Sequence, residues 1–232
     1  MVLNGRASRA GRLDVRWFAL KTAAHLLALL PLAQLLRGAL VDIRGSDPLA
    51  GVGLAAATLG ADPVQAITHA TGDWALRFLL ASLTMTPLRR LTGATWPLRF
   101  RRLLGLYAFA YASLHLATYV VLDLGGYWAQ VFEDIVERPF ITVGFAAWLL
   151  LVPLALTSTR GWMRRLGRRW GQLHRLVYAV AVLAVLHFFW LVKSDLREPL
   201  AYAAVLALLL GLRLFWRLRR PAPVPRAQPR GA

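Results

Sequence analysis

Residues 103–122 read LLGLYAFAYASLHLATYVVL, twenty consecutive residues with no charged side chain and a single histidine, His115. A helix needs about 20 mostly apolar residues to cross a bilayer. Mostly apolar runs of this kind occur six times in the sequence, at residues 17–36, 74–88, 103–122, 140–156, 173–192 and 200–215. Because such alanine- and leucine-rich runs are too long for strands, we expect an all-α membrane protein with six transmembrane helices.

Composition agrees with a membrane protein and excludes several other classes. The chain has 232 residues, 58% of them hydrophobic, and no cysteine. The lack of cysteine excludes disulfides, iron–sulfur clusters, thiolate-ligated haem and cysteine-based zinc sites. The sequence also has neither a GxGxxG motif nor a βαβ pattern, so no nucleotide-binding domain is expected. No internal repeat is evident.

The basic residues show which side of the membrane each connection faces. Of the 28 Lys and Arg residues, 22 lie in four groups: before or at the start of the first run, between the second and third runs, between the fourth run and the start of the fifth, and from the end of the last run onward. Of the 11 acidic residues, all except Asp14 lie elsewhere. The positive-inside rule therefore places both termini in the cytoplasm. The net charge of +17 is then a consequence of topology and of attraction to anionic lipid, which argues against nucleic-acid binding.

These patterns predict three parts of the chain: a basic cytoplasmic tail at 1–16, a transmembrane domain at 17–217 and a disordered Pro- and Arg-rich cytoplasmic tail at 218–232. Asp62 followed by Pro63 is typical of a helix start, and we expect a short interfacial helix from there through His69.

Two of the five histidines lie at matching depths. With Asp123 and Lys193 as markers of the outer ends, His115 and His187 fall about 9–12 Å inside, at 1.5 Å per residue, on helices that run in the same direction. Histidine inside a membrane helix indicates function by default. Two such ligands can hold a haem iron from both sides, so we favour haem; zinc is the competing metal, although no acidic partner lies at that depth.

The other candidates carry alternatives. His174 lies about 20 Å deeper than His187 towards the cytoplasm, either as an interfacial histidine or as a partner of an inner cofactor. His25 is either structural or functional, and His69 is expected to be a solvated surface residue. Arg77 either extends to the interface or pairs with a haem propionate. Arg101 and Arg175 offer bidentate donors for a flavin phosphate or for propionates, unless they only bind lipid phosphates.

An ordered series of motifs resembles the MsrQ (YedZ) family, the haem-binding membrane subunit of the MsrPQ protein-methionine-sulfoxide reductase system. The motifs are Asp62-Pro63-Val64, residues 67–72, 86–90, 101–106, 114–116, 138–144, 156–159, 166–170 and 173–178, and Val192-Lys193. The resemblance covers about residues 17–217.

The resemblance implies a bacterial inner-membrane b-type cytochrome related to the ferric-reductase transmembrane domains. Its implied cofactors are haem b and FMN, and its implied electron donor is the quinone pool or a cytoplasmic flavin reductase. The implied acceptor is a periplasmic molybdenum-containing reductase, MsrP, so the catalytic site would lie on a partner subunit. The family's histidine ligands fall on His115, His174 and His187.

One departure concerns the inner cofactor. Two-haem members of the wider superfamily carry a histidine 14 residues before the one that matches His115, and this chain has Arg101 there. An inner haem would lack that ligand, which favours a flavin near His174.

Two rival functions follow from the same sequence. A ferric or cupric reductase acting directly on external metal would use the acidic loop 133–137 to collect cations. A small-solute transporter would show broken helices and charges in mid-membrane.

Overall fold

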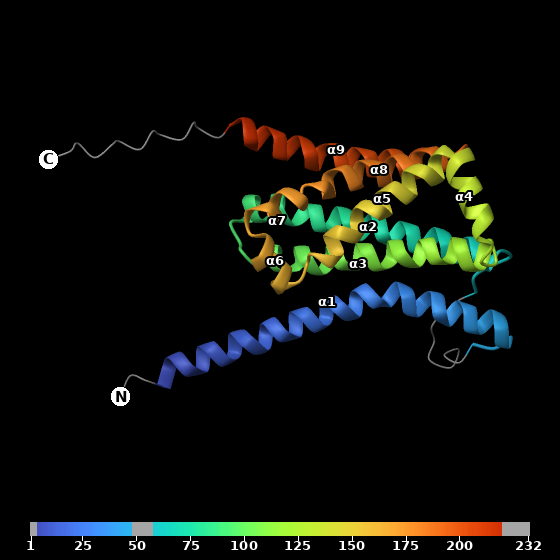
Figure 1. The fold of residues 1–232 in the computed structure, drawn as a ribbon. Coiled ribbons are helices and arrows are strands. Elements are labelled where there is room, and N and C mark those ends of the chain that lie inside the picture. Colours follow the sequence, from blue (N-terminus) through green and yellow to red (C-terminus); the bar gives the residue numbers. More distant parts are fainter. Residues whose placement is uncertain (1–3, 48–57, 220–232) are drawn as a thin grey trace. The chain divides into compact units, whose positions relative to one another are not determined.

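The computed structural model describes residues 4–47 and 58–219, and the helices there follow the apolar runs. The elements, labelled in Figure 1, are α1 (Asn4–Arg44), α2 (Pro63–Thr92), α3 (Pro97–Ala117), the π-helical turn η2 (Thr118–Asp123), α4 (Trp128–Glu137), α5 (Pro139–Leu156), α6 (Arg160–Leu166), α7 (Arg168–Leu173), α8 (Leu176–Leu191) and α9 (Arg197–Leu218). No strand occurs in this described part, so the all-α prediction is confirmed. The expected tail beyond residue 219 lies outside the described residues.

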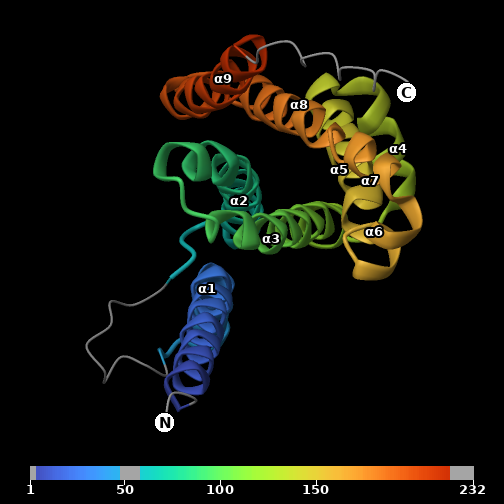
Figure 2. The same cartoon turned by 90° about the vertical axis from the view of Figure 1, so that its left-hand side faces the viewer.

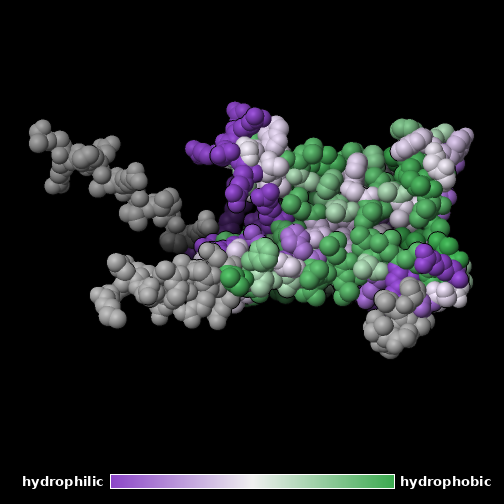
Figure 3. Space-filling model, turned by 90° about the horizontal axis from the view of Figure 1, so that it is seen from below, coloured by the Kyte–Doolittle hydropathy of each residue, from purple (hydrophilic) through white to green (hydrophobic). Residues whose placement is uncertain are grey.

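Five helical segments are long and apolar enough to cross a membrane: Trp17–Arg44, Pro97–Asp123, Pro139–Leu156, Arg168–Leu191 and Arg197–Leu218. The sixth expected span lies in α2, which is not among these five; Arg77 lies within its apolar run and Asp73 directly precedes that run. On the face shown in Figure 3, hydrophobic side chains cover the middle and hydrophilic side chains gather towards the ends. Such a surface is typical of a protein that spans a bilayer.

The start of α2 corrects one expectation. Asp62 caps the helix as predicted, since its side chain accepts a hydrogen bond from Gln65 N at 2.9 Å. The predicted short helix ending near His69 is wrong, because α2 continues without a break to Thr92. No residue there ends the helix, and the hydroxyls of Thr68 and Thr71 bond back to carbonyls of their own helix.

The acidic segment 133–137 was expected to be a loop, and the structure forms it as the end of α4. Asp134 is 2% exposed and pairs with Arg138, with 3.3 Å between Oδ1 and Nε. A carboxylate that is buried and paired in this way is not offered to external cations. The structure therefore removes one of the carboxylates on which the direct metal-reductase alternative relied.

The chain divides into two compact units. The first comprises Met1–Ala75 and Tyr107–Glu133, and the second comprises Leu76–Leu106 and Asp134–Ala232. In the first unit, Tyr111 of α3 is 1% exposed and joins α1 beside Pro31. Its hydroxyl donates to Ala28 O at 2.8 Å and accepts from Leu32 N at 3.2 Å. The hydroxyl thus enters the hydrogen-bond ladder of α1, where Figure 1 shows the helix bending.

In the second unit, α8 packs along α5 and, over a smaller contact, against α9. Figures 1 and 2 both show α8 beside these two helices. The buried side chains there are small or aliphatic, including Ala147, Leu151, Val180 and Ala181. Small residues allow helices to approach closely inside a membrane protein. This close approach positions the histidine of α8, described next.

Candidate functional site

His115, on α3 in the first unit, rests against Gly72 of α2. A Cβ at Gly72 would lie 3.0 Å from its Nδ1 and 3.1 Å from its Cε1. The absence of a side chain exposes the preceding turn of α2, and Nδ1 hydrogen-bonds to Thr68 O at 2.8 Å. Because a carbonyl can only accept, Nδ1 carries the proton and Nε2 carries the lone pair that can ligate a metal.

Two threonines and the π-helical turn η2 lie next to His115. Thr118, the first residue of the π-helical turn η2, donates its hydroxyl to His115 O at 2.8 Å. The hydroxyl oxygen of Thr68 on α2 lies 3.3 Å from that of Thr118, so α2 approaches η2 closely here. π-Helical turns occur often at functional sites, and this one directly follows the candidate ligand.

His187, on α8 in the second unit, is held against α5 in the same way. We call each pair of a glycine and the carbonyl four residues before it a histidine seat. A Cβ at Gly144 would lie 2.6 Å from its Nδ1 and 2.9 Å from its Cε1. Nδ1 hydrogen-bonds to Phe140 O at 2.7 Å, four residues before that glycine. By the same argument Nδ1 is the protonated nitrogen and Nε2 carries the lone pair.

The two seats repeat with the same spacing. In each, the histidine lies 43 residues after the glycine it rests on and 47 residues after the carbonyl it bonds to. A ligating histidine in proteins usually donates its other ring nitrogen to a carbonyl or carboxylate, which fixes the ring and the tautomer. Both seats therefore fit axial ligation of haem iron through Nε2. The seat of His115 lies within the first unit, and the seat of His187 lies within the second.

His174 is held in a different way. It caps α7, stacks on Trp170 with 4.0 Å between ring centroids, and places Nε2 3.1 Å from Thr157 Oγ1. That hydroxyl donates to Pro153 O at 2.6 Å, so Nε2 of His174 must be the donor to it. The nitrogen that carries the lone pair in His115 and His187 carries a proton in His174 and donates a hydrogen bond.

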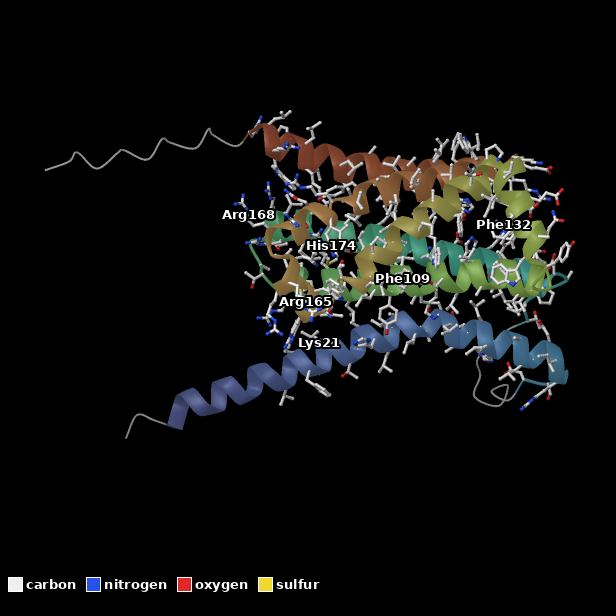
Figure 4. The ribbon with its side chains drawn as sticks, in the orientation of Figure 1. Lys21, Phe109, Phe132, Arg165, Arg168 and His174 are labelled. Atoms are coloured by element: carbon white, nitrogen blue, oxygen red, sulfur yellow. The ribbon has the colours of Figure 1, made fainter. Side chains whose placement is uncertain are left out.

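The three arginines that the sequence singled out, Arg77, Arg101 and Arg175, differ in their contacts and exposure. Arg101 lies close enough to His174 to act on it electrostatically, and its carbonyl accepts a bond from Ser82 Oγ at 2.9 Å. Arg175 is exposed at the N-cap of α8. Arg77 is exposed, and its Nε donates to Tyr202 OH at 2.9 Å. Figure 4 shows His174 at the end of the second unit where Arg165 and Arg168 also lie.

The remaining histidines fit the simpler interpretations. His25 hydrogen-bonds through Nδ1 to Tyr107 OH at 2.8 Å, which joins α1 to α3. His69 is exposed on α2. These contacts support a structural role for His25 and a surface role for His69.

Sequence reasoning missed three residues of interest. Gly72 and Gly144 end two of the family motifs, 67–72 and 138–144, but hydropathy and charge patterns do not single them out as contacts of the histidines. Arg213 was counted with the basic C-terminal cluster, but it is partly buried and its side chain reaches Leu83 O on α2. Its position inside the apolar run 200–215 was the signal that could have found it.

Comparison with known proteins gives a matching family model and several close relatives. Residues 71–185 match the family described as ferric reductase like transmembrane component. The chain is 56% identical over 226 residues, 91% of this chain and 96% of the relative, to the "Protein-methionine-sulfoxide reductase heme-binding subunit MsrQ" of Xanthomonas euvesicatoria pv. vesicatoria. The relatives of the same name in Xanthomonas campestris pv. campestris and Rhodospirillum rubrum are each 58% identical, over 94% and 70% of this chain and over 98% and 78% of their own lengths. No solved structure matches.

Proposed function

The chain belongs to the MsrQ family, and from that premise we propose that it is the haem-binding membrane subunit that relays electrons to a methionine-sulfoxide reductase. The observation that carries the proposal is the pair of matched histidine seats in α3 and α8. His115 and His187 would hold one haem b through Nε2, in the outer half of the bilayer. The bound haem would supply reversible one-electron transfer.

The seats explain what the protein itself contributes. Gly72 and Gly144 let each imidazole approach the neighbouring helix, and the carbonyls of Thr68 and Phe140 fix the ring orientation. A hydrogen bond to Nδ1 raises the basicity of Nε2, which strengthens ligation and stabilises the oxidised state of the metal. The surrounding apolar helices would exclude water from the site.

An inner centre near His174 would receive electrons from the cytoplasmic side. The hydrogen bond from Nε2 to Thr157 argues for a flavin, FMN, beside His174 and against a second haem ligated there. Arg101, close to His174, and Arg175 would provide positive charge for a phosphate group. Arg77 would serve a haem propionate. The electron donor would be the quinone pool or a cytoplasmic flavin reductase.

The topology of this proposal is six transmembrane spans within residues 17–217, with both termini in the cytoplasm of a bacterial inner membrane. The charge alternation supports it, and α2 would supply the sixth span. The partner would be a periplasmic molybdenum-containing reductase of the MsrP kind, which would carry the catalytic site. The unbroken course of α2 and α5 lends no support to a transporter.

Stopped-flow spectroscopy tests the proposal. The haem-loaded chain is reduced, mixed with its purified periplasmic reductase and then given a protein that contains methionine sulfoxide. We expect the haem band to reoxidise only when reductase and oxidised substrate are both present. Reoxidation by ferric citrate alone, at the same rate and without the reductase, would instead favour direct metal reduction.

A further inference from the structure

Arg213 of α9 is a partly buried cation that the electron relay described above does not use. Its Nη2 donates to Leu83 O on α2, and its guanidinium lies 4.9 Å from the ring centre of Tyr178 on α8. Nε and Nη1 are also buried, and neither has a hydrogen-bond partner in the part of the chain that the structure describes. Leu83 of α2, Tyr178 of α8 and Arg213 of α9 all belong to the second unit.

Within residues 4–47 and 58–219, no carboxylate pairs with the charge of Arg213. Its electrostatic neighbours are Tyr178 and a second cation, Arg101. A buried ion without a partner is costly, and inside a membrane protein such a residue indicates a function. Arg213, with two unused N–H donors, and Arg101 together form a region of positive potential, and Arg101 also acts electrostatically on His174.

A neutral donor lies on the same face of α2. Thr86 Oγ1 is buried without a hydrogen-bond partner among the described residues. It lies three residues after Leu83, whose carbonyl accepts from Arg213, so both residues share one side of the helix. The helix therefore offers a hydroxyl towards the region where Arg213 has two unused donors.

We propose that Arg213 and Thr86 bind the phosphate group of a ligand at the inner end of the membrane domain. A phosphate has several acceptor oxygens and a full negative charge, which match the Nε and Nη1 donors of Arg213 and the hydroxyl of Thr86. Arg101 adds favourable potential. The phosphate can come from the FMN of the inner centre, in which case this inference rests on the proposed function.

The second source of the same group is an anionic lipid. Arg213 lies five residues before Leu218, the last residue of α9, or about 7.5 Å along the helix axis. That depth is within reach of a headgroup. The experiment therefore has one arm for each source.

The first arm compares FMN with riboflavin, which differ only in the phosphate. Each flavin is titrated into the full haem-loaded chain and followed by flavin fluorescence. We expect Arg213→Gln and Thr86→Val each to weaken FMN binding about tenfold or more, as for loss of a charge-assisted hydrogen bond, and to leave riboflavin binding unchanged. Arg213→Lys, which keeps the charge but loses the planar fork, should fall between these variants and the unchanged protein.

Arg217→Gln is the matched control, because Arg217 is exposed one turn further along the same helix. The haem absorption spectrum of every variant establishes that the protein is folded. The second arm uses native mass spectrometry of the same proteins from nanodiscs that contain phosphatidylglycerol and phosphatidylcholine. If the phosphate belongs to lipid, Arg213→Gln and Thr86→Val lose retained phosphatidylglycerol, Arg217→Gln does not, and FMN affinity is equal in all.

The proposal is overturned if neither FMN affinity nor retained phosphatidylglycerol distinguishes Arg213→Gln and Thr86→Val from Arg217→Gln. It is also overturned if riboflavin loses as much affinity as FMN. Either result leaves the haem relay standing, because haem ligation and reoxidation are measured separately. Lipid binding without FMN binding would preserve the phosphate site and remove the flavin from the proposed function.

Discussion

At the scale of single residues, two glycines decide how the candidate haem ligands are held. A side chain at Gly144 would lie 2.6 Å from the His187 ring, and one at Gly72 would lie 3.0 Å from the His115 ring. Carbon and nitrogen in ordinary van der Waals contact are about 3.5 Å or more apart. The two positions therefore tolerate no side chain without displacing the imidazole, and Gly144 is the tighter one.

We predict that Gly144→Ala lowers haem content and weakens the low-spin haem signal, and that Gly72→Ala does so to a smaller extent. The reason is the difference in clearance to the two rings. Gly211→Ala is the control, because nothing lies within 4 Å of a Cβ there. Haem per polypeptide and the electron paramagnetic resonance spectrum measure the effect. Equal, full haem content in all three variants would show that the glycines do not form the seats.

His174 allows the proposed inner centre to be tested separately from the proposed outer haem. We predict that His174→Ala slows reduction of the haem by a cytoplasmic-side donor and leaves the haem spectrum intact. The physical reason is that its Nε2 is engaged with Thr157 and not arranged as a ligand. Stopped-flow reduction decides this, with His69→Ala, an exposed histidine, as the control. An unchanged rate with full inner-cofactor content would remove His174 from the pathway.

At the scale of elements, apolar runs predicted the helices well, and the connections poorly. Each of the six runs lies largely within a helix, because length and composition alone make an apolar segment helical in a membrane. α4 was missed because its acidic residues and amphipathic pattern resemble a loop in a scan for apolar runs. The helix that starts at Pro63 was predicted to end near His69, but α2 continues to Thr92. The capping pair Asp62-Pro63 marks where a helix starts and carries no information about where it ends.

The site was only partly accessible to the same reasoning. The depths of His115 and His187 follow from their position along each run, so both were predicted as ligands, and this stays a prediction. Their glycine seats depend on which helices cross and at which residue, and one sequence without a repeat does not reveal this. The partners of Arg213 on α2 and α8 depend on tertiary packing in the same way.

The contact between α1 and α3 gives a prediction at this scale. Tyr111→Phe removes the hydroxyl that joins Ala28 O and Leu32 N. These two backbone groups can then bond to each other in the ordinary helical pattern, so the free energy of unfolding should fall by only about 1 kcal/mol. Thermal unfolding of the purified variant measures it. A loss of several kcal/mol would mean that the backbone groups stay unpaired.

At the scale of the whole molecule, the distribution of charge predicts which ends of the helices face the cytoplasm. Reporter fusions at Gly93, after α2, and at Gly161, in α6, should behave as cytoplasmic, and one at Gly125, after η2, as periplasmic. The reason is the concentration of arginine in the connections that contain the first two positions. The inverted pattern would refute the topology and reverse the direction of electron flow.

The central claim is that one haem b is held between His115 and His187. The most direct test is haem content per polypeptide together with the low-temperature electron paramagnetic resonance spectrum of the unchanged chain, His115→Ala, His187→Ala and His174→Ala. We predict one low-spin haem with two nitrogen ligands in the unchanged chain and in His174→Ala, and its loss in each of the other two. A low-spin haem that survives at full occupancy in His115→Ala or His187→Ala would contradict the account.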